Sequence, residues 1–139
     1  MKLIVSGHGN FASGLVSAAQ LIGGEQSALV AIDFVAGMSG EALRAELSKA
    51  LSSEPTLICT DLLGGAPFRE AVLLSQGRDD VVVIAGTTVQ FLLEAMLTLD
   101  EAGENLRAWA DGLLESAREG VTAYHQQPSR TQQSSDDGI

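Results

Sequence analysis

The stretch LIVSGHGNFASGLVSAAQLIGG, residues 3–24, carries the pattern that decides the fold. Residues 3–5 form a short apolar run that ends in glycines, which is typical of a strand buried on both faces. Over residues 11–22 apolar side chains recur at spacings of three and four, as in a helix with one buried face, with Asn10 as its N-cap. The glycine pair at 23–24 ends this helix. A buried strand followed by an amphipathic helix is the first half of a β-α-β unit.

The same alternation continues along the chain. The pattern predicts strands at residues 29–34, 56–60 and 81–85, and helices at residues 41–51, 67–75, 89–99 and 105–118. Such alternation implies right-handed crossovers and a parallel sheet covered by helices on both faces. We therefore predict a doubly wound, mostly parallel α/β fold with strand order 2-1-3-4, and a possible antiparallel C-terminal strand after Gly120.

Length and composition indicate one domain with an aliphatic core. The chain has 139 residues, of which 45% are hydrophobic, and its aromatic residues are one Trp, one Tyr and four Phe. We expect a domain over residues 1–124. Residues 125–139 are rich in Gln, Ser and Asp and have little to bury, so the sequence predicts a disordered polar tail there.

Charge and cysteine usage exclude several classes of function. The net charge is -10 and the eight Lys and Arg residues are scattered, which argues against nucleic acid as a partner. No apolar run approaches the roughly 20 residues of a membrane span, so we expect no direct membrane insertion. Cys59 is the only cysteine, which rules out an internal disulfide and favours the reducing cytoplasm. His8 and His125 lack ligand spacing, so no metal site is indicated.

Two loops leave the ends of strands that the predicted order places side by side. In doubly wound sheets, ligands bind beyond the carboxyl ends of the strands, where the strand order reverses. For the order 2-1-3-4, that point lies between the first and third strands. The loops there are residues 6–10, with His8 between glycines, and residues 61–67, with Asp61 before a Gly-Gly turn into a helix.

These residue types fit phosphoryl chemistry. A histidine is substantially neutral near pH 7, so a ring nitrogen of His8 can attack phosphorus without an added base. A carboxylate from Asp61 on the other nitrogen would fix the tautomer and stabilise the cation that forms. Backbone amides at the starts of the following helices offer an anion site. The candidate phosphoryl pocket comprises Gly9, Asn10, Gly64, Gly65 and Ala66.

Simpler explanations of the same residues stay open. A histidine in a loop is often a turn or hydrogen-bonding residue, and Asp61 can be a strand-end cap for nearby amides. The turn at residues 64–67 can be only a tight connection, since it is neither a Walker loop nor a dinucleotide fingerprint. Arg69 can assist the phosphate, contact an acidic group of a partner, or form a surface salt bridge.

Six stretches together resemble a known family. They are residues 6–9, 11–14, 24–26, 32–34, 60–68 and 84–86. In this order, from residue 1 to about residue 124, they are similar to the mannose-type IIA proteins of the phosphoenolpyruvate-dependent sugar phosphotransferase system. The set is specific, although each motif alone is weak.

The resemblance implies a phosphotransferase component with a phosphohistidine intermediate. His8 would accept a phosphoryl group from the phosphocarrier protein HPr, on the ring nitrogen remote from Cβ, and pass it to a IIB component that serves membrane IIC and IID components. Asp61 would be its partner residue. Such proteins are cytoplasmic homodimers with four parallel strands and an antiparallel strand near the C-terminus that can be exchanged between subunits. They need no metal or organic cofactor.

Details of sequence favour one sugar branch. Residues 62–65, 68–69, 89–94 and 136–139 look like the N-acetylgalactosamine and galactosamine branch, with other mannose-class sugars as alternatives. Ala66 stands where a hydroxyl residue is common in the family, and Thr88 where an asparagine is usual. Without a hydroxyl at Ala66, more of the phosphate binding is left to backbone amides.

Three rival functions remain at this level. One is the phosphocarrier subunit of a dihydroxyacetone kinase, against which the loop at residues 61–68 argues. Another is a regulatory phosphoprotein module, in which phosphorylation is a signal rather than a step of transport. The last is a non-phosphotransfer enzyme of flavodoxin-like architecture, which is disfavoured because no other catalytic set is present.

Overall fold

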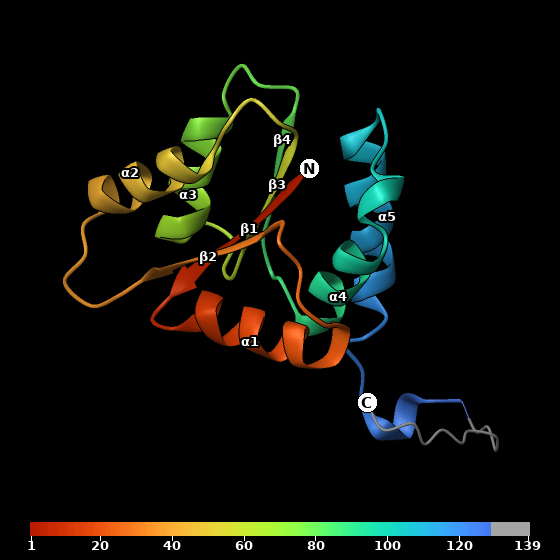
Figure 1. Cartoon of the computed structure of the whole chain (residues 1–139). Helices are drawn as coiled ribbons and strands as arrows, with labels where there is room; N and C mark the ends of the chain where they lie inside the picture. Colours follow the sequence, from red (N-terminus) through yellow and green to blue (C-terminus); the bar gives the residue numbers. More distant parts are fainter. Residues whose placement is uncertain (129–139) are drawn as a thin grey trace.

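The computed structural model describes residues 1–128, which form a central sheet between two layers of helices (Figure 1). The elements in chain order are β1 (Lys2–His8), α1 (Phe11–Gly23), β2 (Leu29–Phe34), α2 (Gly40–Ala50), β3 (Thr56–Thr60), α3 (Ala66–Ser75), β4 (Val81–Ile84), α4 (Val89–Leu97), η1 (Leu99–Glu101), α5 (Leu106–Arg118) and η2 (Tyr124–Gln126). The four strands are parallel and lie in the order β2-β1-β3-β4. The predicted fold class and strand order are confirmed.

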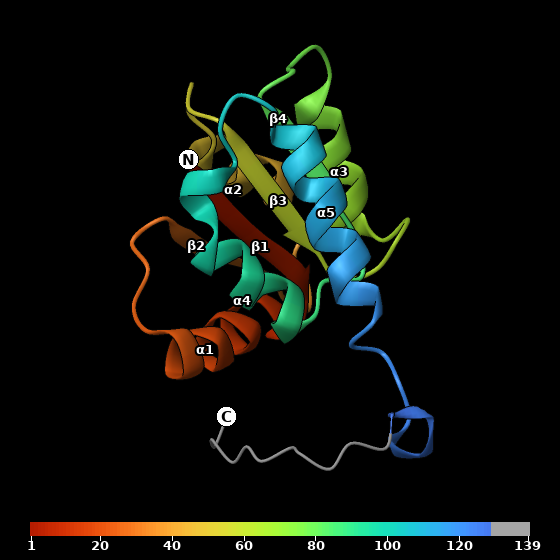
Figure 2. The same ribbon diagram turned by 90° about the vertical axis from the view of Figure 1, so that its right-hand side faces the viewer.

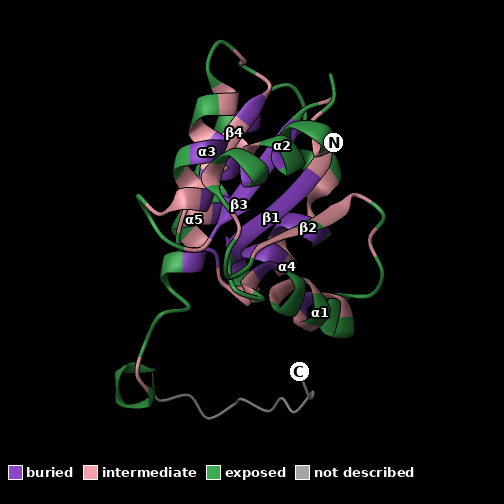
Figure 3. Cartoon of the chain, turned by 90° about the vertical axis from the view of Figure 1, so that its left-hand side faces the viewer, coloured by how far each residue is buried: buried purple, intermediate pink, exposed green. Residues whose placement is uncertain are grey.

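Each central strand contributes to two separate cores. Along β1, Leu3 and Val5 pack with α1, α4 and α5, whereas Ile4 packs with α2 and α3 on the other face. All three side chains are fully buried, which explains the continuous apolar run in the sequence. The two helix layers are visible on either side of the sheet in Figure 2, and Figure 3 shows the buried strands β1 and β3 between them.

The C-terminal segment differs from the prediction. Between α5 and residue 128 the chain forms no strand, so the possible antiparallel C-terminal strand is absent from the described residues. The segment leaves the domain after Arg118, and Val121 and Tyr124 are 75% and 94% exposed, because no part of the described chain packs against them. Of the predicted polar tail, Tyr124–Gln126 overlaps its start as a short 3-10 turn, and residues 129–139 lie outside the described residues.

Helix α4 ends two residues earlier than its predicted limit. The Thr98 hydroxyl donates to the Glu94 carbonyl at 2.7 Å and accepts from the Trp109 indole at 3.0 Å. A hydroxyl that bonds the carbonyl one turn back competes with the regular helical bond, and the chain continues as the 3-10 turn η1. Trp109 therefore anchors α5 to the end of α4.

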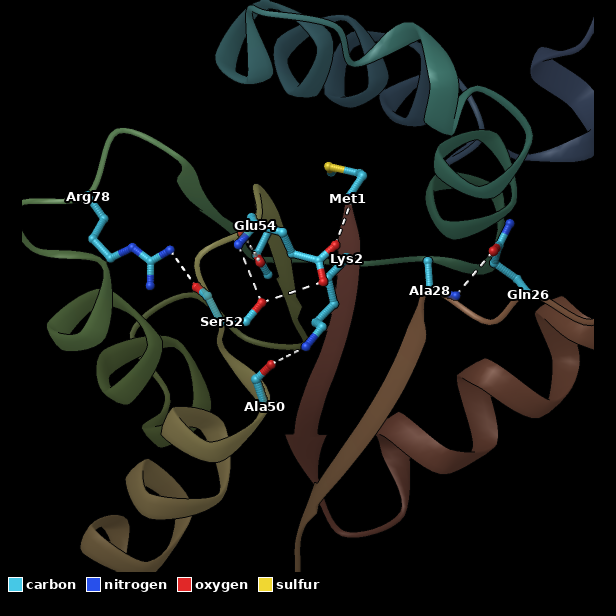
Figure 4. A network of polar contacts seen from close by, with 9 residues as sticks. Met1, Lys2, Gln26, Ala28, Ala50, Ser52, Glu54 and Arg78 are labelled. Atoms are coloured by element: carbon cyan, nitrogen blue, oxygen red, sulfur yellow. Dashed lines mark hydrogen bonds and ion pairs between the residues drawn. The ribbon is translucent and has the colours of Figure 1, made fainter.

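A polar network ties together the loops at the amino ends of the strands (Figure 4). The Met1 amino group donates to Glu54 at 2.8 Å, Ser52 donates to the same carboxylate at 3.5 Å, and Arg78 donates to the Ser52 carbonyl at 2.7 Å. These contacts occupy the edge of the sheet opposite His8, which ends β1. None of the helices in residues 1–128 has the length and apolar character needed to cross a membrane.

Candidate functional site

The carboxyl ends of β1 and β3 bring His8 and Asp61 together. The two strands pair in parallel up to Ser6 and Thr60, His8 is the last residue of β1, and Asp61 directly follows β3. The His8 side chain is 46% exposed, whereas that of Asp61 is only 16% exposed. The pair predicted from the two loops thus meets at the edge of the sheet where the strand order reverses.

One carboxylate oxygen of Asp61 holds the histidine twice. Asp61 Oδ2 accepts the His8 backbone N–H at 2.9 Å and lies 2.8 Å from His8 Nδ1. Burial acts to raise the pKa of Asp61, but the hydrogen bonds from the His8 backbone and ring, together with the charge of the ring, outweigh it and lower that pKa below its usual value. The carboxylate is therefore ionised at neutral pH.

This contact fixes the tautomer of the histidine. An ionised carboxylate can only accept hydrogen bonds, so His8 Nδ1 must carry the proton that faces Asp61 Oδ2. In the neutral ring the lone pair then resides on Nε2, the nitrogen remote from Cβ. This geometry is suited to nucleophilic attack by Nε2, because the ring nitrogen is unprotonated and the carboxylate could stabilise a cation on the ring.

Two neighbours constrain the imidazole ring. The Phe34 ring meets it edge to face, with centroids 5.7 Å apart and an interplanar angle of 74°. On the other loop, a Cβ added to Gly65 would lie only 2.8 Å from His8 Cε1, so a side chain there would displace the ring. The sequence reasoning gave Phe34 no role. The sequence feature that could have indicated this contact is an aromatic residue at the carboxyl end of the strand that pairs with β1.

The start of α3 provides free amides beside the ring. Gly65 occupies the N-cap of this helix without a side-chain cap, and Pro67 has no N–H. Within residues 1–128 the backbone N–H groups of Ala66 and Phe68 have no acceptor. Unpaired amides at a helix N-terminus bind anions, and these follow directly on the glycine that contacts His8.

The backbone amides at the start of α1 have a different arrangement of hydrogen-bond partners. Asn10 makes no side-chain cap, and Asp33 of β2 accepts instead from the Ser13 backbone N–H at 2.9 Å and from the Ser13 hydroxyl at 2.7 Å. The Gly9 N–H donates to the Phe34 carbonyl at 2.8 Å. Of the predicted pocket, the α3 side therefore has free amides next to the ring, whereas the Gly9 amide is already engaged.

The loop between Asp61 and α3 is closed by two hydrogen bonds. The Gly65 N–H donates to the Leu62 carbonyl at 3.0 Å, and Arg69 Nη1 donates to the Gly64 carbonyl at 2.7 Å. Gly64 adopts a φ of 82°, a backbone conformation that favours glycine. Arg69, which the sequence offered as a phosphate or partner contact, thus lies against the loop that carries the site.

The other candidate residues lie outside this site. Cys59 is fully buried in β3, and burial strongly raises the pKa of its thiol. His125 lies in the turn η2 at the end of the described chain. In residues 1–128 no three His, Cys, Asp or Glu side chains gather as ligands for a metal ion.

Comparison with known proteins identifies the family. The family model EIIA-man, described as the PTS system fructose IIA component, matches residues 2–117. A phosphotransferase system component EIIA from Streptococcus agalactiae superposes with a TM-score of 0.84 at 34% identity, over 91% of this chain and 98% of that one. The mannose/sorbose-specific IIA subunit from Enterococcus faecalis does so with a TM-score of 0.82 at 27% identity, over 94% and 98% of the two chains.

Curated relatives point the same way. The mannose-specific EIIAB component of Escherichia coli K12 is 32% identical over 134 residues, and the fructose-specific EIIA component of Bacillus subtilis is 29% identical over 117 residues. The alignments cover 92% and 78% of this chain. This chain spans 41% of the length of the first relative and 80% of the second. The chain belongs to the mannose family of IIA components of the phosphotransferase system.

Proposed function

We propose that His8 accepts a phosphoryl group from phospho-HPr and passes it to a IIB component, with Asp61 as its orienting partner. The observation that carries the proposal is the double hydrogen bond of Asp61 Oδ2 to the His8 backbone and ring. It sets the proton on Nδ1 and leaves Nε2 as the nucleophile. The exposure of the ring allows another protein to bring its own phosphohistidine to this atom.

The bonds that form and break in the proposed phosphoryl transfer balance without a cofactor. As the bond between His8 Nε2 and phosphorus forms, the bond between phosphorus and the donor's histidine nitrogen breaks, and the donor keeps that electron pair. The positive charge that develops on the His8 ring is stabilised by Asp61 through Nδ1–H. The second transfer reverses these roles, with His8 as the leaving group.

The free amides of Ala66 and Phe68 are suited to the phosphoryl oxygens. They belong to the helix start whose N-cap, Gly65, packs against His8 Cε1, the ring atom next to Nε2. The partial positive charge of the helix N-terminus favours the incoming phosphoryl charge. Because Ala66 lacks a hydroxyl, the backbone supplies these donors.

The test is direct phosphorylation. The protein is incubated with phosphoenolpyruvate, enzyme I and HPr, and intact-mass analysis should find an acid-labile gain of one phosphate. His8→Ala should abolish this gain, whereas His125→Ala, which removes the other histidine, should retain it. Retention of the acid-labile phosphate in His8→Ala would overturn the proposal.

We further propose a sugar of the N-acetylgalactosamine and galactosamine branch, on the support of residues 62–65, 68–69 and 89–94. The relatives carry the names of mannose, fructose and sorbose systems, and a IIA component passes on phosphate without touching the sugar. Phosphoryl transfer from phospho-His8 to a panel of purified IIB components tests the assignment. We expect the galactosamine-type IIB to be the preferred acceptor.

A cytoplasmic homodimer is part of the same proposal. The exposed Val121 and Tyr124 follow α5 without a packing partner in residues 1–128, and β4 is an edge strand of the sheet. An edge strand and an unpacked apolar segment are both suited to pairing with a second copy. Light scattering should give twice the chain mass, and a monomer at all concentrations would contradict the dimer.

A further inference from the structure

Asp61 lies just beyond the hydrogen-bonded part of the sheet. The pairing of β3 with β1 ends at Thr60, and the pairing of β3 with β4 ends one residue earlier, at Cys59. Within residues 1–128 the Asp61 carboxylate receives hydrogen bonds from no other residue than His8. The direction of this carboxylate therefore depends on how the backbone at the end of β3 is held.

A threonine from the connection between β4 and α4 holds the peptide unit that precedes Asp61. The Thr60 carbonyl accepts two hydrogen bonds from Thr87, one from its backbone N–H at 3.1 Å and one from its hydroxyl at 2.7 Å. This carbonyl and the Asp61 nitrogen belong to the same planar peptide unit, so the two bonds also fix the direction in which Asp61 leaves the strand. Thr87 is only 6% exposed, so both bonds form away from bulk water, where they are stronger.

Thr87 is itself anchored on both sides. Before it, the Thr60 hydroxyl donates to the carbonyl of Ile84, the last residue of β4, at 2.7 Å. After it, Thr88 is the N-cap of α4, and its hydroxyl accepts from the Phe91 N–H at 3.1 Å. Thr87 is thus fixed between a strand end and a helix start, which makes it a rigid support for the Thr60 carbonyl.

The Asp61 carboxylate has little room to move. A Cβ added to Gly7 would lie 2.9 Å from Asp61 Cγ, so the carboxyl group packs closely against the backbone of β1. On its other side, Oδ2 meets two donors of His8 at once, the backbone N–H at 2.9 Å and the ring nitrogen at 2.8 Å. A small displacement of the Asp61 backbone would lengthen one of these bonds, and phosphoryl transfer depends steeply on such geometry.

We propose that Thr87 is a positioning residue for phosphoryl transfer, because its hydroxyl, through the Thr60 carbonyl, keeps Asp61 in the orientation that sets the tautomer of His8. The proposal rests on the phosphocarrier function of His8 and deepens it, since it adds a residue from outside the two loops that carry the site. Loss of the hydroxyl lets the peptide unit rotate, and Asp61 Oδ2 then holds the Nδ1 proton less well.

The experiment measures initial rates of phosphoryl transfer against the concentration of phospho-HPr. Thr87→Val removes the hydroxyl but keeps the backbone N–H, so the Thr60 carbonyl retains one donor and the fold is preserved. We expect kcat to fall about fivefold to tenfold with KM unchanged, because the misplaced pair reacts more slowly while the donor protein binds as before. Thr87→Ala, which also lacks the hydroxyl, should show the same fall, and Thr87→Ser, which keeps it, should restore the wild-type kcat.

A spectroscopic measurement follows the tautomer directly. In NMR spectra of the ring nitrogens of neutral His8, the wild type should show Nδ1 protonated and Nε2 free. Thr87→Val should show part of the population with the proton on Nε2, and Thr87→Ser should resemble the wild type. This measurement needs no phosphoryl donor, and a merely structural role of Thr87 would not change its result.

Thr56 provides a matched control on the same strand. It is fully buried at the amino end of β3, and its hydroxyl donates to the Glu54 carbonyl at 3.0 Å. Thr56→Val therefore removes a comparable hydrogen bond at the edge of the sheet opposite His8. Its unfolding temperature should fall by an amount similar to that of Thr87→Val, whereas its kcat, its KM and its His8 tautomer should match those of the wild type.

The outcomes separate the two proposals. If wild-type His8 is not phosphorylated, the phosphocarrier function fails, and the NMR spectra still show whether Thr87 orients Asp61. If His8 is phosphorylated but Thr87→Val keeps the wild-type kcat or the wild-type tautomer, the role of Thr87 is wrong and the function stands.

Two further results would also overturn the role of Thr87. Thr87→Ser as slow as Thr87→Val would show that the hydroxyl is not the group that matters. A rise in KM at constant kcat, or an equal loss of kcat in Thr56→Val, would show that the hydroxyl acts on partner binding or on overall stability.

Discussion

Asp61 directs every hydrogen bond that its side chain forms within residues 1–128 to His8. Oδ2 accepts both the backbone N–H and the ring contact, whereas Oδ1 is buried without a partner. A buried carboxylate oxygen without a donor carries a desolvation cost that an apolar side chain at this position would not have. The main contributions that lower the pKa of Asp61 against its burial are thus the hydrogen bonds and the charge of His8.

Asp61→Asn should leave the fold intact and slow phosphoryl transfer to His8 by about a hundredfold or more. The amide can keep an acceptor for the His8 backbone but loses the charge that stabilises the ring cation. Rapid-quench measurement of phospho-His8 formation, with circular dichroism to check folding, tests this. Transfer at the wild-type rate would remove Asp61 from the mechanism.

The contribution of the Asp61 carboxylate to the stability of the protein should depend on pH. The pKa of Asp61 is lowered from 3.8 in the folded protein, so its contribution is fully present above that value and is lost as the pH falls through the lower folded pKa. The unfolding temperatures of the wild type and Asp61→Asn should differ at pH 6, and the difference between them should become smaller below about pH 3.8. A difference in unfolding temperature that does not change with pH would contradict the link between stability and the ionisation of Asp61.

Gly65→Ala should slow phosphorylation by about tenfold, because its methyl group would lie 2.8 Å from His8 Cε1 and displace the ring from its attack geometry. The backbone angles at Gly65 suit alanine, so the effect is steric rather than conformational. Gly14→Ala, where no atom lies within 4 Å of an added Cβ, is the control and should transfer normally. Equal rates in the two variants would show that this contact does not orient the ring.

Ala66→Ser should lengthen the lifetime of phospho-His8 about three- to tenfold. A hydroxyl at the start of α3 adds one donor next to the free amides, and one hydrogen bond contributes about 1 kcal/mol. The decay of the isolated phosphoprotein, followed by intact mass at neutral pH, measures it. Ala66→Val, which adds bulk without a donor, should give no such gain.

Asp33→Ala should lower the free energy of unfolding by about 1 kcal/mol, because the Ser13 amide at the start of α1 loses its acceptor. Transfer through His8 should stay within about twofold. Asn10→Ala is the matched control, since Asn10 makes no side-chain cap bond, and it should unfold like the wild type. Chemical denaturation of both variants shows whether Asp33 or Asn10 provides the side chain that caps α1.

The fold could be predicted because its signals are local. The apolar run at residues 3–5 and the helical spacing at residues 11–22 reflect burial on two faces and on one face. The parts of the prediction that differ from the structure depend on contacts between distant segments. Asn10 is the N-cap residue of α1 as predicted, but its side chain makes no capping bond, and Asp33 on β2 accepts the Ser13 amide instead. The predicted final strand has no partner in the described chain.

The pairing of His8 with Asp61 could be expected from the strand order, since both loops leave the same edge of the sheet. The details of the pocket could not. The contact of Phe34 with the ring and the hydrogen bond of Arg69 to Gly64 depend on side-chain positions that no sequence pattern encodes. The residue types suggested the chemistry and the family resemblance named the partner proteins, but neither indicated these neighbours.

Cys59 makes the protein suited to site-specific spectroscopy. It is the only cysteine, it is fully buried in β3, and its raised pKa keeps the thiol protonated and unreactive. A new cysteine at an exposed position such as Leu73 would therefore take a fluorophore or spin label alone, without removal of the native thiol. Binding of another protein to the labelled chain can then be followed with one position changed and the rest of the sequence unaltered.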